Sequence, residues 1–270
     1  CLIIDDGGTD NTYEVLQPFL EKDNRFSLFK RSNSYKKGLP GCRNYGLDIA
    51  TGDYIIFFDD DDIVHPDNLL LCIKELTKGQ DHFCRYLRTV FTGDFHYKFD
   101  NKETYDSFNI SYKDLDKMLD GRLPFNSCAV MWRKECFIDN RFVEDLMYAE
   151  EWELYSRLLS LGFSGVSIDK ILFYGRKHPN SNTGEFWNND PVRLASKKEA
   201  IFLVAQNLVK SNMLSIKLKA YLLNKAINFR DFKLLNRLLQ VFCISTQEKI
   251  FYLFKFIAFP VWLTYKAFTK

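Results

Sequence analysis

Four consecutive carboxylates, Asp59 to Asp62, follow directly after the apolar run YIIFF at residues 54–58. Adjacent carboxylates repel one another and resist ionising together unless a cation lies among them. Mg2+ and Mn2+ prefer oxygen ligands and bridge carboxylates to substrate phosphates. The run therefore predicts a metal and phosphate site that holds Mn2+ or Mg2+, with a solvated acidic loop as the simpler alternative for part of it.

A second acidic pair, Glu150 and Glu151, stands immediately before a helical pattern of apolar residues at 152–159. A carboxylate held there can act as a general base that removes the proton of a hydroxyl group. The positive end of a helix dipole also tolerates carboxylates without any catalytic role. Both interpretations stay open from the pattern alone.

A histidine, His178, lies in the polar segment RKHPNSNT that follows the strand-like run VSIDKILFY. Imidazole is a common metal ligand and hydrogen-bond donor. His178 is therefore a candidate for the metal site, or for contact with a phosphate or an acceptor. A purely structural histidine is the alternative.

Alternating short apolar runs and helical patterns must position these groups. Residues 1–5, 26–30 and 53–59 have the pattern of strands, and residues 9–23, 41–50 and 66–78 that of helices. This alternation predicts an α/β fold with a mixed, mainly parallel sheet covered by helices on both faces. Ligands bind at the carboxyl ends of such strands, where Asp5-Asp6 and the 59–62 run both fall.

From about residue 186 the pattern changes to helices, expected at 191–211, 214–226, 229–240 and 247–268. The last one is rich in aromatic residues, but Lys255 and Pro260 interrupt it, so a membrane-spanning helix is not expected. It suits either an interfacial helix on an anionic membrane or a helix packed on protein. The boundaries predicted are a catalytic domain at 1–185 and a helical region at 186–270.

Composition limits the other possibilities. The 270 residues are 46% hydrophobic, enough for a sizeable core. The seven cysteines form no Cys-x-x-Cys pair, which argues against a disulfide framework and favours a reducing cytoplasmic location. Residues 210–270 carry a charge balance of +9 and the rest −7, yet no nucleic-acid-binding motif is present, so no nucleic-acid partner is expected.

Three segments, IIDDGGTDNT, GLPGCRNYGLDIATGDYIIFFDDDDIVHPDNL and FVEDLMYAEEWELYSRLLSLGF, together resemble the family 2 inverting glycosyltransferases of the GT-A fold. The resemblance covers about residues 1–185. The chain starts at Cys1 within a strand pattern, and the opening strand and helix usual in that family are expected to precede it.

The resemblance implies a role for each candidate residue. Asp6 would bind the base of the nucleotide, Asp5 would assist or hold the loop, and Arg43 would border the nucleotide, unless it forms only a surface salt bridge. In the Asp-x-Asp motif, Asp61 would be the main metal ligand with Asp62 auxiliary and His178 completing the shell. Asp59 would lie near the ribose or the metal shell, and Asp60 toward the donor. Glu151 takes the place of the family's usual aspartate base, with Glu150 beside it.

The activity implied is transfer of a sugar from a nucleotide-diphosphate sugar, most often a UDP-sugar, to a glycan or glycolipid acceptor. The setting implied is bacterial cell-surface polysaccharide or lipooligosaccharide synthesis, in the cytoplasm at the inner face of the plasma membrane. Two departures, Gly8 where the family commonly has serine and Glu151, keep open a sugar-nucleotide-binding module without transferase activity. A sugar nucleotidyltransferase is the other alternative.

Overall fold

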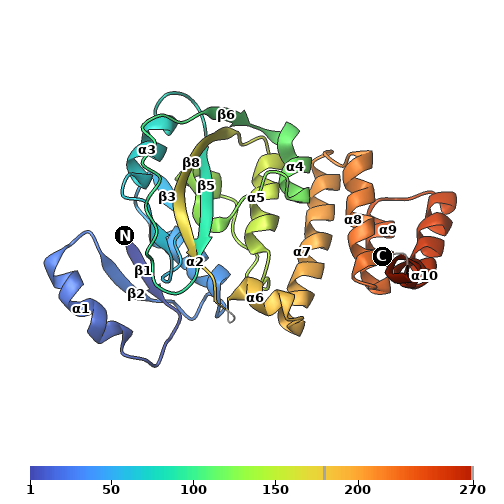
Figure 1. Ribbon diagram of the computed structural model, residues 1–270, viewed down its shortest axis with the longest axis horizontal. Helices are drawn as coiled ribbons and strands as arrows, with labels where there is room; N and C mark the ends of the chain where they lie inside the picture. The colour runs from blue at the N-terminus through green and yellow to red at the C-terminus, as the bar shows by residue number, and fades with distance from the viewer. Residues whose placement is uncertain (179–180, 269–270) are drawn as a thin grey trace.

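The computed structural model describes residues 1–178 and 181–268, the stretch 260–268 as helical backbone only. A mixed α/β body carries an extended array of helices at its C-terminal end (Figure 1). At the N-terminus, β1 (Leu2–Asp5), α1 (Thr12–Lys22) and β2 (Ser27–Lys30) form a parallel two-stranded unit at one edge of the molecule. The expected strands at 1–5 and 26–30 are confirmed.

The main sheet has six strands in the order β3-β7-β5-β8-β4, with β6 paired to β8. The strands are β3 (Tyr54–Ile56), β4 (Ile63–Val64), β5 (Phe83–Phe91), β6 (Ser107–Ile110), β7 (Val130–Arg133) and β8 (Gly165–Arg176). The expected mixed α/β architecture is confirmed, but a mainly parallel sheet is wrong for these strands. Only β5 and β8 pair in parallel within this sheet, and its other four pairings are antiparallel.

The antiparallel pairings arise mainly from strands that lie outside the predicted alternation. β6 and β7 return to the sheet through loops and short helices, namely η1 (Tyr112–Asp114), α4 (Leu115–Asp120) and η2 (Ser127–Ala129). Gly165 permits the close approach of β8 to β5, because an added Cβ would lie 2.3 Å from the carbonyl oxygen of Phe83. Strand direction is set by these long-range contacts.

The remaining elements of the body are α2 (Leu39–Ile49), α3 (Asn68–Leu76), η3 (Lys134–Phe137) and α5 (Glu150–Ser160). The C-terminal region consists of α6 (Asn182–Trp187), α7 (Pro191–Lys210), α8 (Ile216–Asn228), α9 (Phe232–Val241) and α10 (Thr246–Phe268). The four long C-terminal helices fall close to their expected ranges. Side chains of Asp190, Ser215 and Asp231 cap the starts of α7, α8 and α9 by accepting backbone hydrogen bonds.

One apolar core extends from the sheet into the C-terminal helices. Trp132 on β7 and Tyr155 on α5 belong to the same buried cluster as Val204 on α7, Leu222 on α8 and Leu235 on α9. The helices after residue 186 thus pack directly on the α/β body through α5 and α7. The boundary near residue 185 remains a prediction.

Helix α10 packs on one side only over its described side chains. Tyr252 is buried, whereas Ile250, Phe251, Phe254 and Ile257 are each more than half exposed. No helix in the described part of the chain is both long and apolar enough to cross a membrane. The expectations that concern side chains from Pro260 onward lie outside the described side chains.

Candidate active site

The acidic run lies in the connection between β3 and β4 and begins three residues after the end of β3. Three of its four carboxylates have partners, each a different residue. Asp59 accepts a hydrogen bond from Arg43 at 3.1 Å, and Asp62 accepts one from the backbone N–H of Arg176 at 2.7 Å. His178 Nε2 donates to Asp61 Oδ2 at 3.1 Å. Asp60 is exposed, and no described residue pairs with its carboxylate.

Among the described residues, Asp59, Asp62 and Cys128 offer ligand atoms that all lie within 4.8 Å of one another. Burial raises the pKa of Asp62 to about 6, and the carboxylates of Asp61 and Asp59 act in the same direction. This mutual repulsion is what a divalent cation relieves. Burial raises the pKa of the Cys128 thiol to about 12, so the thiol stays protonated and is a poor metal ligand. The donors that remain are carboxylate oxygens, which fit Mn2+ or Mg2+.

Arg43 on α2 links the acidic run to the start of α5. Its guanidinium donates to Asp59 and Ser127 through Nη2 and to Glu150 Oε1 through Nη1, each at 3.1 Å. The rings of Phe57 and Phe142 lie against it. Its side chain is only 5% exposed, so the alternative of a surface salt bridge is wrong. Burial opposes the charge, but Glu150 and Asp59 raise the pKa of Arg43.

The two glutamates at the start of α5 have different surroundings. Glu150 is buried and ion-paired with Arg43. Burial raises the pKa of Glu150, the neighbouring Glu151 raises it further, and Arg43 opposes both. Glu151 is partly exposed, and no described residue forms a hydrogen bond or ion pair with its carboxylate. Arg43 therefore holds Glu150 in place and leaves Glu151 as the available carboxylate.

A strained residue sets the direction of these two side chains. Ala149, which precedes α5, has a left-handed backbone with φ of 64° and is buried. This conformation costs a residue other than glycine on the order of 1–3 kcal/mol, and such residues cluster at functional sites. The turn brings Glu150 onto Arg43 and leaves Glu151 beside it at the helix start, where the helix dipole stabilises carboxylates.

The acidic end of β1 is held by backbone and arginine donors. Asp5 accepts from the N–H of Gly8 at 2.9 Å, which holds the loop. Asp6 accepts from the N–H of Gly38 at 2.9 Å and forms an ion pair with Arg31. Burial would raise the pKa of Asp6, but the hydrogen bonds from Arg31 and Gly38 lower it below its ordinary value. Asp6 therefore stays ionised.

Three contacting residues are not among the predicted site residues. Arg31 directly follows β2 and Cys128 lies in η2, and no local signal marks either of them. Arg176, at the end of β8, donates through Nε to the carbonyl of Asp61 at 2.9 Å and stacks 4.7 Å from the ring centre of Phe91. It fixes the loop that bears Asp61 and aligns it with His178.

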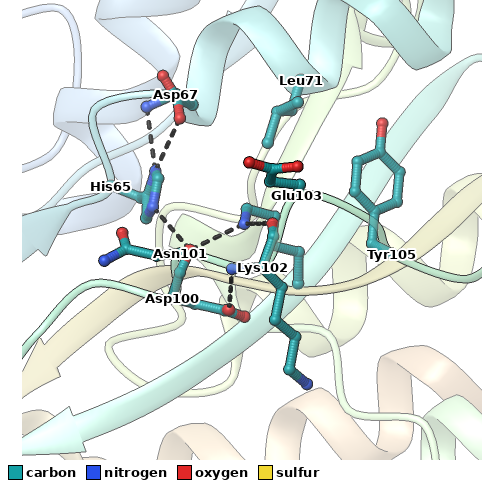
Figure 2. A pocket seen from close by; sticks show the side chains of 9 residues that line it. His65, Asp67, Leu71, Asp100, Asn101, Lys102, Glu103 and Tyr105 are labelled. Atoms are coloured by element: carbon teal, nitrogen blue, oxygen red, sulfur yellow. Dashed lines mark hydrogen bonds and ion pairs between the residues drawn. The ribbon is translucent and has the colours of Figure 1, made fainter.

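A separate cavity of about 200 Å3 lies between α3 and the segment 100–105 (Figure 2). His65 accepts from the N–H of Asp67 and donates to the carbonyl of Asp100, and the buried Lys170 donates to the carbonyls of Asp100 and Lys102. These bonds fix the segment onto the sheet. The cavity contains none of the predicted site residues.

The family model described as Glycosyl transferase family 2 matches residues 1–140, more than half of the chain. Over 217 residues the chain is 27% identical to glycosyltransferase GlyG of Streptococcus pneumoniae, a match covering 73% of this chain and 68% of GlyG. It is also 27% identical over 157 residues to the GalNAc(5)-diNAcBac-PP-undecaprenol beta-1,3-glucosyltransferase of Campylobacter jejuni, covering 58% of this chain and 49% of that enzyme.

Among solved structures, residues 1–349 of S. aureus TarS in complex with UDP-GlcNAc match with a TM-score of 0.60 at 17% identity. The match covers 95% of this chain and 71% of that one. The corresponding UDP complex matches with the same TM-score over 92% of this chain and 67% of that one. The chain belongs to the family 2 glycosyltransferases and has the GT-A fold.

Proposed function

We propose that this glycosyltransferase moves a sugar from a UDP-sugar to a hydroxyl group of a glycan or glycolipid acceptor, with inversion at the anomeric carbon. The observation that carries the proposal is the double ion pair of Arg43 with Asp59 and Glu150. It couples the acidic run, which would hold the diphosphate, to the helix start that presents Glu151. The donor site and the base are thereby held at a fixed position relative to each other.

The donor would lie along the ends of β1 and β3. Ionised Asp6 can accept a hydrogen bond from the N3–H of uracil, while Asp5 holds the loop around it. Asp59 and Asp62, with Asp61 and His178 adjacent, would hold a Mn2+ or Mg2+ ion. When bound, the ion neutralises charge on the diphosphate leaving group. Asp60 would contribute only to the negative potential of the rim.

Glu151 would be the general base. Inverting transfer needs a carboxylate on the acceptor side that removes the hydroxyl proton as the oxygen attacks the anomeric carbon. Breaking the ion pair between Glu150 and Arg43 would leave a buried charge without this partner, which is costly. The role of Glu150 would therefore be to position Arg43 and α5. The proton would go to the carboxylate of Glu151, and the nucleoside diphosphate would leave from the opposite face of the sugar.

The biological setting is part of the proposal. The exposed apolar side chains of α10 and the positive charge of residues 210–270 suit peripheral contact with an anionic membrane. We place the enzyme in the cytoplasm at the inner face of the plasma membrane, in synthesis of a bacterial cell-surface polysaccharide or lipooligosaccharide. The named substrate of the Campylobacter relative, a lipid-linked glycan, is compatible with this setting.

The test is a panel of UDP-sugars with purified protein and Mn2+, in which released UDP is measured with and without EDTA. The anomeric configuration of the product is then read by NMR. Release from one donor that stops with EDTA, together with an inverted product, is the expected result. A product with retained configuration would refute the role of Glu151. Donor binding without release, even with acceptor glycans added, would indicate a binding module.

A further inference from the structure

One carboxylate joins three segments that lie far apart in the sequence. Glu144 belongs to the segment between η3 and α5, and its Oε2 atom accepts a hydrogen bond from the backbone N–H of Lys36 at 2.7 Å. Its Oε1 atom accepts from Nδ2 of Asn44 on α2 at 2.9 Å. These donors lie 108 and 100 residues earlier in the chain. Both oxygens of Glu144 therefore hold other parts of the protein.

The Asn44 end of this link is rigid. Asn44 is only 4% exposed, and its amide donates to the carbonyl oxygen of Phe142 and accepts from the N–H of Phe142, each at 3.0 Å. The ring of Phe142 lies against the guanidinium of Arg43. Buried amide groups that are fully hydrogen-bonded fix the segments that they join. Glu144 is thus tied firmly to α2.

The other end of the link restrains the loop that leads into α2. Lys36 lies close to the first turn of α2, because a Cβ added to Gly41 would be 1.9 Å from the carbonyl oxygen of Lys36. Two residues after Lys36, the N–H of Gly38 donates to Asp6 Oδ2 at 2.9 Å. Gly38 has a φ of 119°, in the region that favours glycine. The position of Lys36 therefore sets where the N–H of Gly38 points.

The carboxylate of Asp6 is held at both oxygens. Arg31 donates to Oδ1 and Gly38 to Oδ2, and each oxygen keeps a further lone pair that can accept from a ligand. A carboxylate held in this way would accept from a donor in one direction only, such as the N3–H of uracil. Cytosine has no hydrogen at N3, but a carboxylate that can turn would accept from its exocyclic amino group instead. The orientation of Asp6 thus decides which base it selects.

We propose that Glu144 is a positioning residue for selection of the donor base. By holding Lys36 near α2 it fixes Gly38, and Gly38 in turn fixes the carboxylate of Asp6 toward uracil. The inference rests on the proposed function, in which Asp6 binds the base of a UDP-sugar. Glu144 acts through the loop and not by contact with the donor, so its substitution should change the choice between bases.

The test compares Glu144→Ala with Asp145→Ala. Asp145 is exposed and forms an ion pair with the side chain of Lys36, so its variant removes the same charge beside the loop but leaves the backbone link intact. Binding of UDP and of CDP, each with Mg2+, is measured by calorimetry, because these ligands share the diphosphate and differ in the base. The parent and Asp145→Ala should prefer UDP by about tenfold or more, and in Glu144→Ala this preference should fall to about threefold or less.

Glu144→Gln is the conservative variant, and hydrogen exchange tests the link itself. The carbonyl oxygen of the new amide can still accept from the N–H of Lys36, so Glu144→Gln should keep most of the preference for UDP. In the protein without ligand, the amides of Lys36 and Gly38 are followed by NMR. Both should exchange faster in Glu144→Ala by about fivefold or more, and neither should in Asp145→Ala.

A preference for UDP that persists in Glu144→Ala, or an unchanged exchange rate of the Gly38 amide, would overturn the positioning role. Equal loss of the preference in Glu144→Gln and Glu144→Ala would overturn the link through Lys36. Both results would leave the contact of Asp6 with uracil standing. A parent protein that binds UDP and CDP equally well would instead refute that contact, and the inference with it, so the two failures are distinguishable.

Discussion

Exchange of each glutamate at the start of α5 for glutamine separates catalysis from stability. Glu151→Gln removes a carboxylate that has no hydrogen-bond or ion-pair partner in the described structure, so the free energy of unfolding should hardly change. Loss of a general base typically costs a factor of about 10^2 to 10^4 in rate. At about 1.36 kcal/mol per factor of ten, this corresponds to about 2.7–5.4 kcal/mol of transition-state stabilisation.

Glu150→Gln should have the opposite effects, lowering the free energy of unfolding while changing the rate little. It removes one of the two carboxylates paired with the buried Arg43, and breaking a buried ion pair costs about 3–5 kcal/mol in the free energy of unfolding. Asp59 and Ser127 still accept from the guanidinium, so we expect the lower end, about 3 kcal/mol. At a temperature where the variant is folded, its rate should stay within about tenfold of the parent.

The assay combines metal-dependent UDP release from the donor identified in the panel with urea unfolding of each variant. Glu151→Asp is the matched control, because it restores a carboxylate and should recover part of the rate. The reasoning is refuted if Glu150→Gln abolishes UDP release without loss of stability while Glu151→Gln remains active. Glu150 would then be the general base, and Glu151 would not.

Further predictions concern the metal, the loop after β1 and α10. In calorimetric titrations, Asp62→Asn should weaken Mn2+ binding by about tenfold or more, whereas exposed Asp60→Asn should not; equal effects would contradict the metal site. Because the folded pKa of Asp6 lies below its ordinary value of 3.8, Asp6→Asn should lower the melting temperature at pH 7. That difference should shrink as pH falls below 3.8 and through the folded pKa, and a difference independent of pH would count against the ion pair. Phe254→Ser should weaken cosedimentation with anionic vesicles by about tenfold, unlike Ile138→Ser on the α/β body; equal loss would exclude α10 as the contact.

Local patterns predicted the elements whose cause is local. The 3.6-residue periodicity located α7, α8 and α9, and the apolar runs located β1, β2 and β3. Strand directions in the main sheet could not be read, because the pairing of β7 with β3 and β5 joins segments far apart in the sequence. A continuous apolar run has the same appearance in a parallel and in an antiparallel sheet when both faces are covered.

In the candidate site, too, local patterns predicted one part and long-range contacts decide the other. The acidic run and the pair at 150–151 were visible as residue types, but their separate roles depend on partners far away in the chain. Arg43 lies 107 residues before Glu150, and Arg176 lies 114 residues after Asp62. Arg43 pairs with Glu150 and not with Glu151 because of the backbone turn at Ala149, which no residue preference would predict for alanine. Two adjacent glutamates thereby obtain opposite tasks. The buried one maintains the geometry through an ion pair, and the other remains available for proton transfer, so a single substitution at either position tests one task without the other.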